Sequence, residues 1–154
     1  MYRGRRLRKN PVIRNMMKET RLDKSELIYP LFIVEGDNIK EEIASMPNVY
    51  HYSIDRLHEV LDEMISCGIF SCILFGIPAH KDETGSQAYA SDVIVQRAIR
   101  FIKAYDERFY VIGDVCMCEY TSHGHCGILD EHHDVDNDAT LPVLSKIAVS
   151  YALA

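Results

Sequence analysis

The stretch from Leu27 to Val34, LIYPLFIV, is an almost continuous apolar run and decides the class of fold. Apolar side chains on both faces are typical of a strand buried in a parallel sheet. Two later stretches have the same character, CILFGI at 72–77 and FYVIGDV at 109–115. Pro30 lies within the first stretch, where it removes one ladder hydrogen bond and argues against a central strand. On balance the sequence predicts three buried strands.

Amphipathic helices are predicted after these strands. The first begins after Ser53, a potential N-cap, and ends at Gly68, which can adopt a left-handed conformation. Its apolar residues recur at helical spacing, at Leu57, Val60, Leu61, Met64 and Ile65. The second is expected to begin at a Ser91 cap and to bury Val95, Ala98, Ile99 and Ile102. Residues 35–52, between the first strand and the first helix, contain Gly, Asp, Asn and Pro and are predicted to form a loop.

A third helix is predicted near the end of the chain. Asp138 would cap it, and Pro142 would lie in its first turn, where proline is tolerated. Its core face would contain Leu144, Ile147, Ala148 and Tyr151. Because this helix continues to Ala154 without a cap, we expect that the sequence is cut there rather than naturally ended.

The predicted order of elements is β, α, β, α, β, α. Such alternation implies a parallel sheet with right-handed crossovers, and therefore an α/β fold. Two architectures fit this order: a small open sheet, or the first three units of an eight-fold barrel. A complete barrel needs roughly 250 residues, so the 154 residues of this chain cannot close one.

Composition places the chain among soluble globular proteins and excludes several functions. Hydrophobic residues make up 47% of the chain and charged residues 26%, which is ordinary for a globular domain. The net charge of −6 argues against a general nucleic-acid binder. The sequence has no run of 18 apolar residues, and no apolar segment follows its basic start, so neither a membrane span nor a secretory signal is expected. We therefore expect a cytoplasmic protein.

Basic residues crowd the N-terminus, at Arg3, Arg5, Arg6, Arg8 and Lys9. Asn10 and Pro11 follow as the cap and first residue of a short predicted helix with an apolar stripe, Val12, Ile13, Met16 and Met17. We assign residues 1–24 to an N-terminal arm and residues 25–154 to the main domain. Composition alone leaves two interpretations of the arm open: a solvated, flexible terminus, or a segment that docks on another subunit or an acidic partner.

The residues that suggest chemistry lie within 114–127, DVCMCEYTSHGHCG. Cys116 and Cys118 follow a predicted strand, and on an extended chain their side chains would point to the same face. Cys126 returns eight residues later, and two glycines in the same stretch allow the loop to fold back. Three thiolates can thus converge, and such a set suits zinc. Three protein ligands would leave one position for water or substrate, as in catalytic zinc sites.

Spacing alone leaves other interpretations of this stretch open. The C-x-C pair could be two core thiols or a redox pair, and His123 or His125 could fill the fourth position of a structural zinc site. Asp114 could orient a ligand, transfer a proton or simply cap the loop. The odd total of five cysteines argues against a disulfide framework, and we expect Cys67 and Cys72 to be core thiols.

The stretch 114–127 resembles the zinc-binding sequence of the porphobilinogen synthases, also called 5-aminolaevulinate dehydratases. Similar segments occur in the same order along nearly the whole chain: RRLR at 5–8, YPLF at 29–32, SMP at 45–47, LFG at 74–76, HKD at 80–82 and VDNDAT at 135–140. A resemblance in this many segments, in the same order along nearly the whole chain, is not expected by coincidence.

The resemblance implies a (β/α)8 TIM barrel, of which this chain contains about the first three β/α units after the arm 1–24. It implies a lyase of tetrapyrrole and haem biosynthesis that condenses two molecules of 5-aminolaevulinate into porphobilinogen with loss of two waters. The ligands of a Zn²⁺ ion would be Cys116, Cys118 and Cys126.

In this family two lysines form Schiff bases with the substrates, and both are expected downstream of this sequence. We therefore assign no catalytic residue within the chain. Lys81 alone among its lysines lies in a predicted βα loop, but charged neighbours flank it, and a Schiff-base lysine needs a desolvated pocket.

The family also forms homo-oligomers, commonly octamers, in which the arm wraps a neighbouring subunit, so the resemblance favours the docking interpretation of the arm. No nucleic-acid or membrane partner is expected. Two alternatives are an inactive zinc-binding fragment or interaction module, and a redox protein that uses Cys116 and Cys118. The redox alternative is weaker because a spacing of two residues strains a disulfide.

Overall fold

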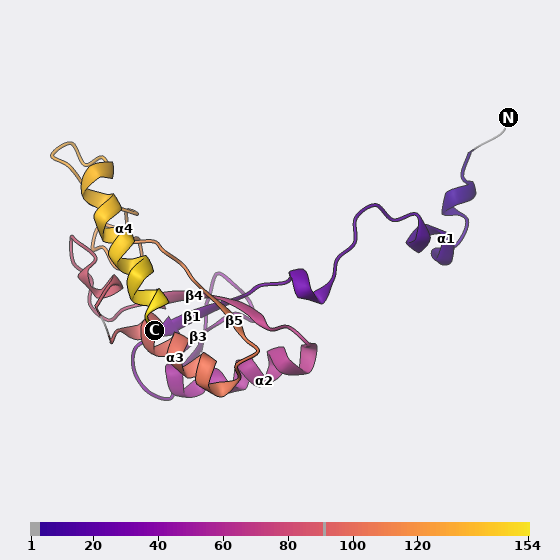
Figure 1. Cartoon of the computed structure of the whole chain (residues 1–154), viewed down its shortest axis with the longest axis horizontal. Coiled ribbons are helices and arrows are strands. Elements are labelled where there is room, and N and C mark those ends of the chain that lie inside the picture. The colour runs from indigo at the N-terminus through magenta and orange to yellow at the C-terminus, as the bar shows by residue number, and fades with distance from the viewer. Residues whose placement is uncertain (1–3, 91) are drawn as a thin grey trace.

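A five-stranded sheet in the order β2-β3-β1-β4-β5 forms the centre of the chain in the computed structural model, which describes residues 4–90 and 92–154. Three of its strands, β1 (Tyr29–Val34), β4 (Ser71–Ile77) and β5 (Tyr110–Gly113), are the predicted strands. They are parallel, as predicted, with Leu31 opposite Leu74 and Cys72 opposite Val111 (Figure 1). Arg3 and Ser91, for which we predicted roles in the arm and in a helix cap, lie outside the described residues.

The prediction of a loop over residues 35–52 was wrong, because this segment contains two strands. β2 (Lys40–Glu42) pairs with β3 (Tyr50–Tyr52) in antiparallel fashion, and β3 pairs with β1 in parallel. Each strand has only three residues, and β2 is charged and exposed, so neither shows an apolar run. Charged side chains on a short strand are how proteins protect the edge of a sheet.

Pro30 is accommodated because one side of β1 is open at that position. The β3 strand pairs with β1 only at Phe32 and Ile33, whereas β4 pairs with β1 along its whole length. The proline therefore has a strand neighbour on one side only, which is the kind of position where a strand tolerates proline.

Two helices, α2 (Leu57–Cys67) and α3 (Ile94–Tyr105), pack on the same side of the sheet (Figure 1). Their predicted core faces are buried, except that Ile65 is only partly covered. Gly68 ends α2 in the predicted left-handed conformation, with φ of 74°. Ser53 does not cap α2 as predicted. Its hydroxyl oxygen instead accepts a hydrogen bond from Ile39 N at 2.8 Å, and α2 follows the 3-10 turn η3 (Ile54–Arg56).

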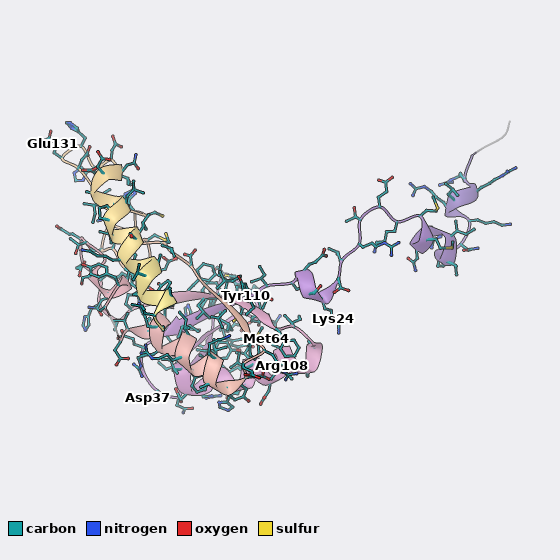
Figure 2. All side chains as sticks on the ribbon, in the orientation of Figure 1. Lys24, Asp37, Met64, Arg108, Tyr110 and Glu131 are labelled. Atoms are coloured by element: carbon teal, nitrogen blue, oxygen red, sulfur yellow. The ribbon has the colours of Figure 1, made fainter. Side chains whose placement is uncertain are left out.

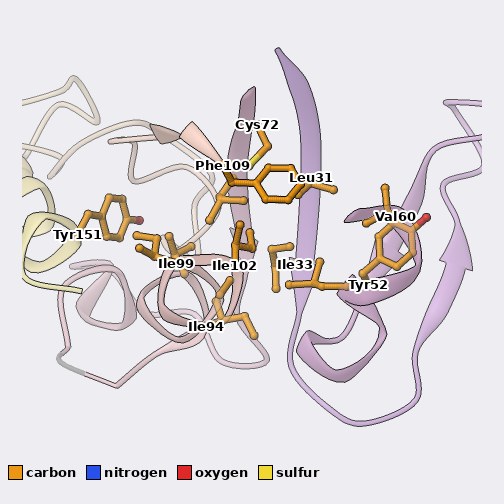
Figure 3. Packing of buried hydrophobic residues seen from close by; sticks show 14 of the residues in the cluster. Leu31, Ile33, Tyr52, Val60, Cys72, Ile94, Ile99, Ile102, Phe109 and Tyr151 are labelled. Atoms are coloured by element: carbon orange, nitrogen blue, oxygen red, sulfur yellow. The ribbon is translucent and has the colours of Figure 1, made fainter. Parts of the chain in front are cut away.

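The core lies between the sheet and these helices. Leu31, Ile33 and Cys72 point toward the helices and are fully buried (Figure 3). The side chains that alternate with them lie on the other face, where Phe32 and Phe75 stack at 5.2 Å between ring centroids and stay half-buried. Within the described residues, the helices thus cover one face of the sheet.

The third predicted helix is present as α4 (Asn137–Ala152), with two differences. Asp136 rather than Asp138 caps it, because the Asp136 carboxylate accepts a hydrogen bond from Ala139 N at 3.1 Å. Pro142 is therefore the sixth helical residue and lies in the second turn rather than the first. Ile147 and Tyr151 are buried and Leu144 is partly buried, as predicted, but Ala148 is exposed.

The N-terminal arm extends away from the sheet (Figure 1). It contains the 3-10 turn η1 (Arg6–Arg8) and the predicted helix α1 (Pro11–Met16), and the 3-10 turn η2 (Lys24–Glu26) spans its boundary with the domain. Asn10 caps α1 as predicted, with its side-chain oxygen 2.9 Å from Ile13 N. Lys24, labelled in Figure 2, links the arm to the domain by donating a hydrogen bond to Cys67 O at 2.7 Å. Among the described residues, no helix combines the length and apolar character needed to cross a bilayer.

Candidate metal centre

Three cysteines converge beyond the carboxyl end of β5. The sulfur atoms of Cys116, Cys118 and Cys126 all lie within 4.8 Å of one another. Cys116 Sγ and Cys118 Sγ are 3.3 Å apart. In α/β barrels the carboxyl ends of the strands form the active face, and the thiols lie beyond this end of β5.

A tight turn, rather than an extended chain, brings Cys116 and Cys118 together. The strand ends at Gly113, and Tyr120 N and Thr121 N both donate hydrogen bonds to Met117 O at 2.9 Å. The side chain of Met117 is fully buried and anchors this turn. We predicted that Cys116 and Cys118 would meet because they share one face of an extended segment. The two thiols do meet, but the chain is bent there, so the predicted reason was wrong.

The segment that returns to Cys126 is held at both ends. Gly124 has φ of 76°, a left-handed conformation that favours glycine. On the N-terminal side of Cys126, Thr121 Oγ1 donates a hydrogen bond to His125 O at 2.9 Å. On the C-terminal side of Cys126, Ile128 N donates a hydrogen bond to Thr140 Oγ1 on α4 at 2.9 Å. The loop thus runs from the end of β5 to the start of α4 and carries Cys126 back toward the other two cysteines.

Close contact with α4 and with the loop before it explains the glycine that follows Cys126. A Cβ atom on Gly127 would lie 2.5 Å from Val135 Cγ1 and 2.6 Å from Thr140 Oγ1, which is closer than real Cβ contacts. Gly127 is therefore needed for space rather than for an unusual backbone angle.

The thiols of Cys118 and Cys126 resist ionisation in the surroundings that the chain itself provides. Burial raises the pKa of Cys118, and hydrogen bonds with Glu119 and Cys116 raise it further. The hydrogen bond with Cys116 is also the main reason why the pKa of Cys126 is raised. A divalent cation reverses these preferences, because cysteine binds metals as the thiolate and metal binding releases the proton. Three soft donors at this separation fit zinc in chemistry and in number.

Carboxylates, not histidines, complete the surroundings of the cysteines. Glu119 Oε2 lies 3.1 Å from Cys118 Sγ, and oxygen atoms of Asp114 and Glu119 lie within 4.8 Å of Cys116 Sγ. Burial, followed by the charge of Glu119, raises the pKa of Asp114. Sequence reasoning weighed Asp114 but missed Glu119, although its position directly after Cys118 was a usable signal.

Of the two histidines that we considered as a fourth ligand, His123 has both ring nitrogens engaged elsewhere. His123 Nδ1 accepts a hydrogen bond from His125 N at 3.1 Å, and His123 Nε2 lies 3.3 Å from Glu83 O. Neither histidine joins a group of potential metal ligands among the described residues. Of the two expected core thiols, Cys72 is buried, which raises its pKa to about 12, but Cys67 is exposed.

Comparison with known proteins identifies the family. Residues 1–154 match the family model described as delta-aminolevulinic acid dehydratase. The chain belongs to the delta-aminolevulinic acid dehydratase family. This assignment confirms the resemblance predicted from the cysteine stretch and the shorter segments.

Named members of the dehydratase family are similar along almost the whole chain. The delta-aminolevulinic acid dehydratase of Ruminiclostridium josui is 53% identical over 152 residues, which cover 99% of this chain and 74% of that protein. The dehydratase of Staphylococcus epidermidis is 47% identical over 149 residues, which cover 96% of this chain and 46% of that protein. The chain thus spans less than half the length of the staphylococcal dehydratase.

A solved dehydratase structure has the same fold. The delta-aminolevulinic acid dehydratase (porphobilinogen synthase) of Toxoplasma gondii, in complex with the reaction product porphobilinogen, superposes with a TM-score of 0.93. It is 32% identical in sequence, and the match covers 99% of this chain and 44% of that one. The five-stranded sheet described above fits part of a TIM barrel.

Proposed function

We propose that the protein containing this chain is a porphobilinogen synthase, which condenses two molecules of 5-aminolaevulinate into porphobilinogen with loss of two waters. This reaction would serve tetrapyrrole and haem biosynthesis. The observation that carries the proposal is the convergence of three thiols within 4.8 Å beyond the end of a parallel strand, in a chain of the dehydratase family. The Toxoplasma relative, solved with porphobilinogen, supports the choice of reaction.

Zinc is the proposed cofactor, with Cys116, Cys118 and Cys126 as its protein ligands. A zinc ion bound there would act as a Lewis acid that polarises or orients a substrate oxygen or nitrogen. The three thiols would hold the cation beyond the carboxyl end of β5, and a site with three protein ligands would keep one position for substrate or water. Carboxylates beside the thiols, Asp114 and Glu119, give this site further polar groups.

The covalent chemistry is proposed to lie outside this chain. Lysine nucleophiles need a desolvated pocket that lowers the pKa of the amine. Lys81, the one lysine predicted on the active face, is exposed in the β4–α3 loop. We therefore propose that the Schiff-base lysines belong to the part of the family sequence that this chain does not cover.

Replacement of one thiol tests the zinc assignment. We expect Cys126→Ala, made in the longest reading frame that contains this sequence, to weaken zinc binding more than about 100-fold. Even changes to groups that only orient the metal ligands typically cost about 10–100-fold. Zinc stoichiometry and the rate of porphobilinogen formation are the measurements. Cys67→Ala, which removes an exposed thiol on α2, is the matched control. Unchanged zinc content and turnover in Cys126→Ala would reject the ligand assignment.

Two alternative functions give different outcomes in the same experiments. An inactive zinc-binding or interaction module would bind zinc but form no product even when the complete reading frame is expressed. A redox protein would form a reversible disulfide between Cys116 and Cys118, whose sulfur atoms stand 3.3 Å apart rather than at the bonded distance of about 2.05 Å. Thiol counts of oxidised and reduced samples distinguish this case.

Self-association through the N-terminal arm is part of the proposal. In α1, Val12 and Met16 are 67% and 71% exposed, although both are apolar. Such a surface suits docking on another subunit, so we propose a homo-oligomer, with an octamer as the expected size. A cytoplasmic location is proposed as well, because the five cysteines are all free thiols, as is usual in a reducing compartment.

A further inference from the structure

Asp82, in the loop between β4 and α3, organises a tight turn. Its Oδ1 atom accepts hydrogen bonds from Thr84 N at 2.9 Å, Thr84 Oγ1 at 3.0 Å and Ser86 N at 3.1 Å. Its Oδ2 atom accepts a further hydrogen bond from Ser86 Oγ. One carboxylate thus holds four donors, and the turn includes Gly85 in a left-handed conformation with φ of 61°.

The same residue is joined by its backbone to the loop that carries the cysteines. Asp82 N donates a hydrogen bond to Tyr120 O at 3.3 Å, and Ser122 N donates to Asp82 O at 2.9 Å. These bonds form a parallel β-bridge between Asp82 and Thr121, which is buried. The turn at Asp82 is therefore hydrogen-bonded to residues 120–122.

Residues 120–122 lie between Cys118 and Cys126. Thr121 also restrains the residue before Cys126, because its hydroxyl donates a hydrogen bond to His125 O. A ligand on an unrestrained loop must be ordered when metal binds, and that ordering weakens affinity. Without the bridge at Asp82, the segment before Cys126 would lose its main backbone attachment to the β4–α3 loop.

We propose that Asp82 is a positioning residue for the metal centre: through residues 120–122 it holds the Cys126 thiol within reach of Cys116 and Cys118. This inference rests on the proposed function, which assigns the three cysteines as zinc ligands. Asp82 itself touches neither metal nor substrate. The turn presents donors to both oxygen atoms of the Asp82 side chain. A carboxylate can accept at both atoms, whereas an amide has only one acceptor oxygen, so the carboxylate is required.

Metal titration of the complete protein tests the role of Asp82. We expect Asp82→Asn to weaken Zn²⁺ and Co²⁺ binding 10- to 100-fold, the usual range for groups that orient metal ligands. Co²⁺ also reports thiolate coordination through its absorption spectrum. Asp106→Asn is the matched control, because Asp106 also organises a turn and accepts a hydrogen bond from Arg108 N at 3.0 Å. This turn lies between α3 and β5, ahead of β5 rather than beyond its carboxyl end. The control variant should therefore leave metal affinity unchanged. Ser86→Ala removes one donor to the Asp82 carboxylate and serves as a milder variant in case Asp82→Asn does not fold. We expect Ser86→Ala to weaken metal binding several-fold.

A double-mutant cycle separates positioning from a general loss of stability. If Asp82 acts through Cys126, Asp82→Asn should have little further effect on metal affinity once Cys126 is replaced by alanine. An equal loss in both backgrounds, or no loss in the wild-type background, would overturn the inference while leaving the zinc assignment intact. Failure of the wild-type protein to bind either metal would instead overturn the proposed function, and this inference with it.

Discussion

At the scale of single residues, two glycines in the strands make room for a pair of buried tyrosines. The hydroxyl groups of Tyr120, from the cysteine loop, and Tyr151, from α4, lie 3.4 Å apart. A Cβ atom on Gly76 in β4 would collide with the Tyr120 hydroxyl, and one on Gly113 in β5 would lie 2.5 Å from Tyr151 Cδ2. The glycines therefore let the loop and the helix approach the sheet closely.

We expect Gly113→Ala to lower the free energy of unfolding by about 1–3 kcal/mol, the usual cost of overpacking a well-filled site. The added methyl group would push Tyr151 and the end of α4 away from β5. Chemical denaturation of the complete protein is the measurement. Gly4→Ala serves as control, because nothing lies within 4 Å of a Cβ atom at Gly4. Equal stability of both variants would show that the ring moves aside at no cost.

At the scale of secondary-structure elements, Glu59 joins the hairpin β2–β3 to the helix α2. Its carboxylate is bonded to Arg56 and lies 3.0 Å from Lys40 Nζ on β2. The ammonium group of Lys40 also lies 5.3 Å and 5.7 Å from the ring centroids of Tyr50 and Tyr52 on β3. The short strands β2 and β3, which have little core of their own, are thus linked to α2 by one cluster of charged and aromatic side chains.

The Glu59 cluster predicts a dependence of stability on pH. Hydrogen bonds, first with Arg56 and then with Lys40, lower the pKa of Glu59 to about 2, below the value of about 4.3 expected in the unfolded chain. A lowered native pKa means that this contribution is complete above about pH 4.3 and is lost as the pH falls toward 2.

We therefore expect Glu59→Gln to flatten the loss of stability between about pH 4.3 and pH 2, while it lowers stability at neutral pH. Denaturant unfolding at several pH values measures both effects. Glu107→Gln, at an exposed glutamate, should keep the slope of the wild-type protein. A variant of Glu59 with an unchanged slope would show that the cluster does not form in solution.

At the scale of the whole molecule, the described residues leave two apolar surfaces partly or largely uncovered. One is the face of the sheet that carries Phe32 and Phe75, opposite the helices. The other is the exposed side of α1 in the arm. Parallel sheets normally have both faces covered, and the chain spans only 46% of its staphylococcal relative.

Residues 1–154 expressed alone are expected to form no porphobilinogen and to bind a hydrophobic dye through the uncovered sheet face. The complete reading frame, assayed beside them, should form product and bind less dye. Product from purified residues 1–154, free of the host enzyme, would refute this prediction.

The arm should control assembly. We expect Met16→Asp to shift the protein to smaller species in sedimentation, because a charge replaces an apolar side chain in the proposed docking surface. Asn15→Asp adds the same charge at a neighbouring polar position of α1 and should leave the assembly largely intact. The same sedimentation profile for both variants and the wild type would show that α1 does not join subunits.

The sequence by itself determined the three parallel strands, the helices between them, the family and the three cysteines. These features depend on local patterns: apolar runs, helical spacing and a distinctive stretch around Cys116. Only the tertiary structure decided how the cysteines meet, that Glu119 joins them, and that β2 and β3 extend the sheet. It also decided that Asp82 pairs with Thr121, since contacts between segments about 40 residues apart leave no periodic signal in the sequence.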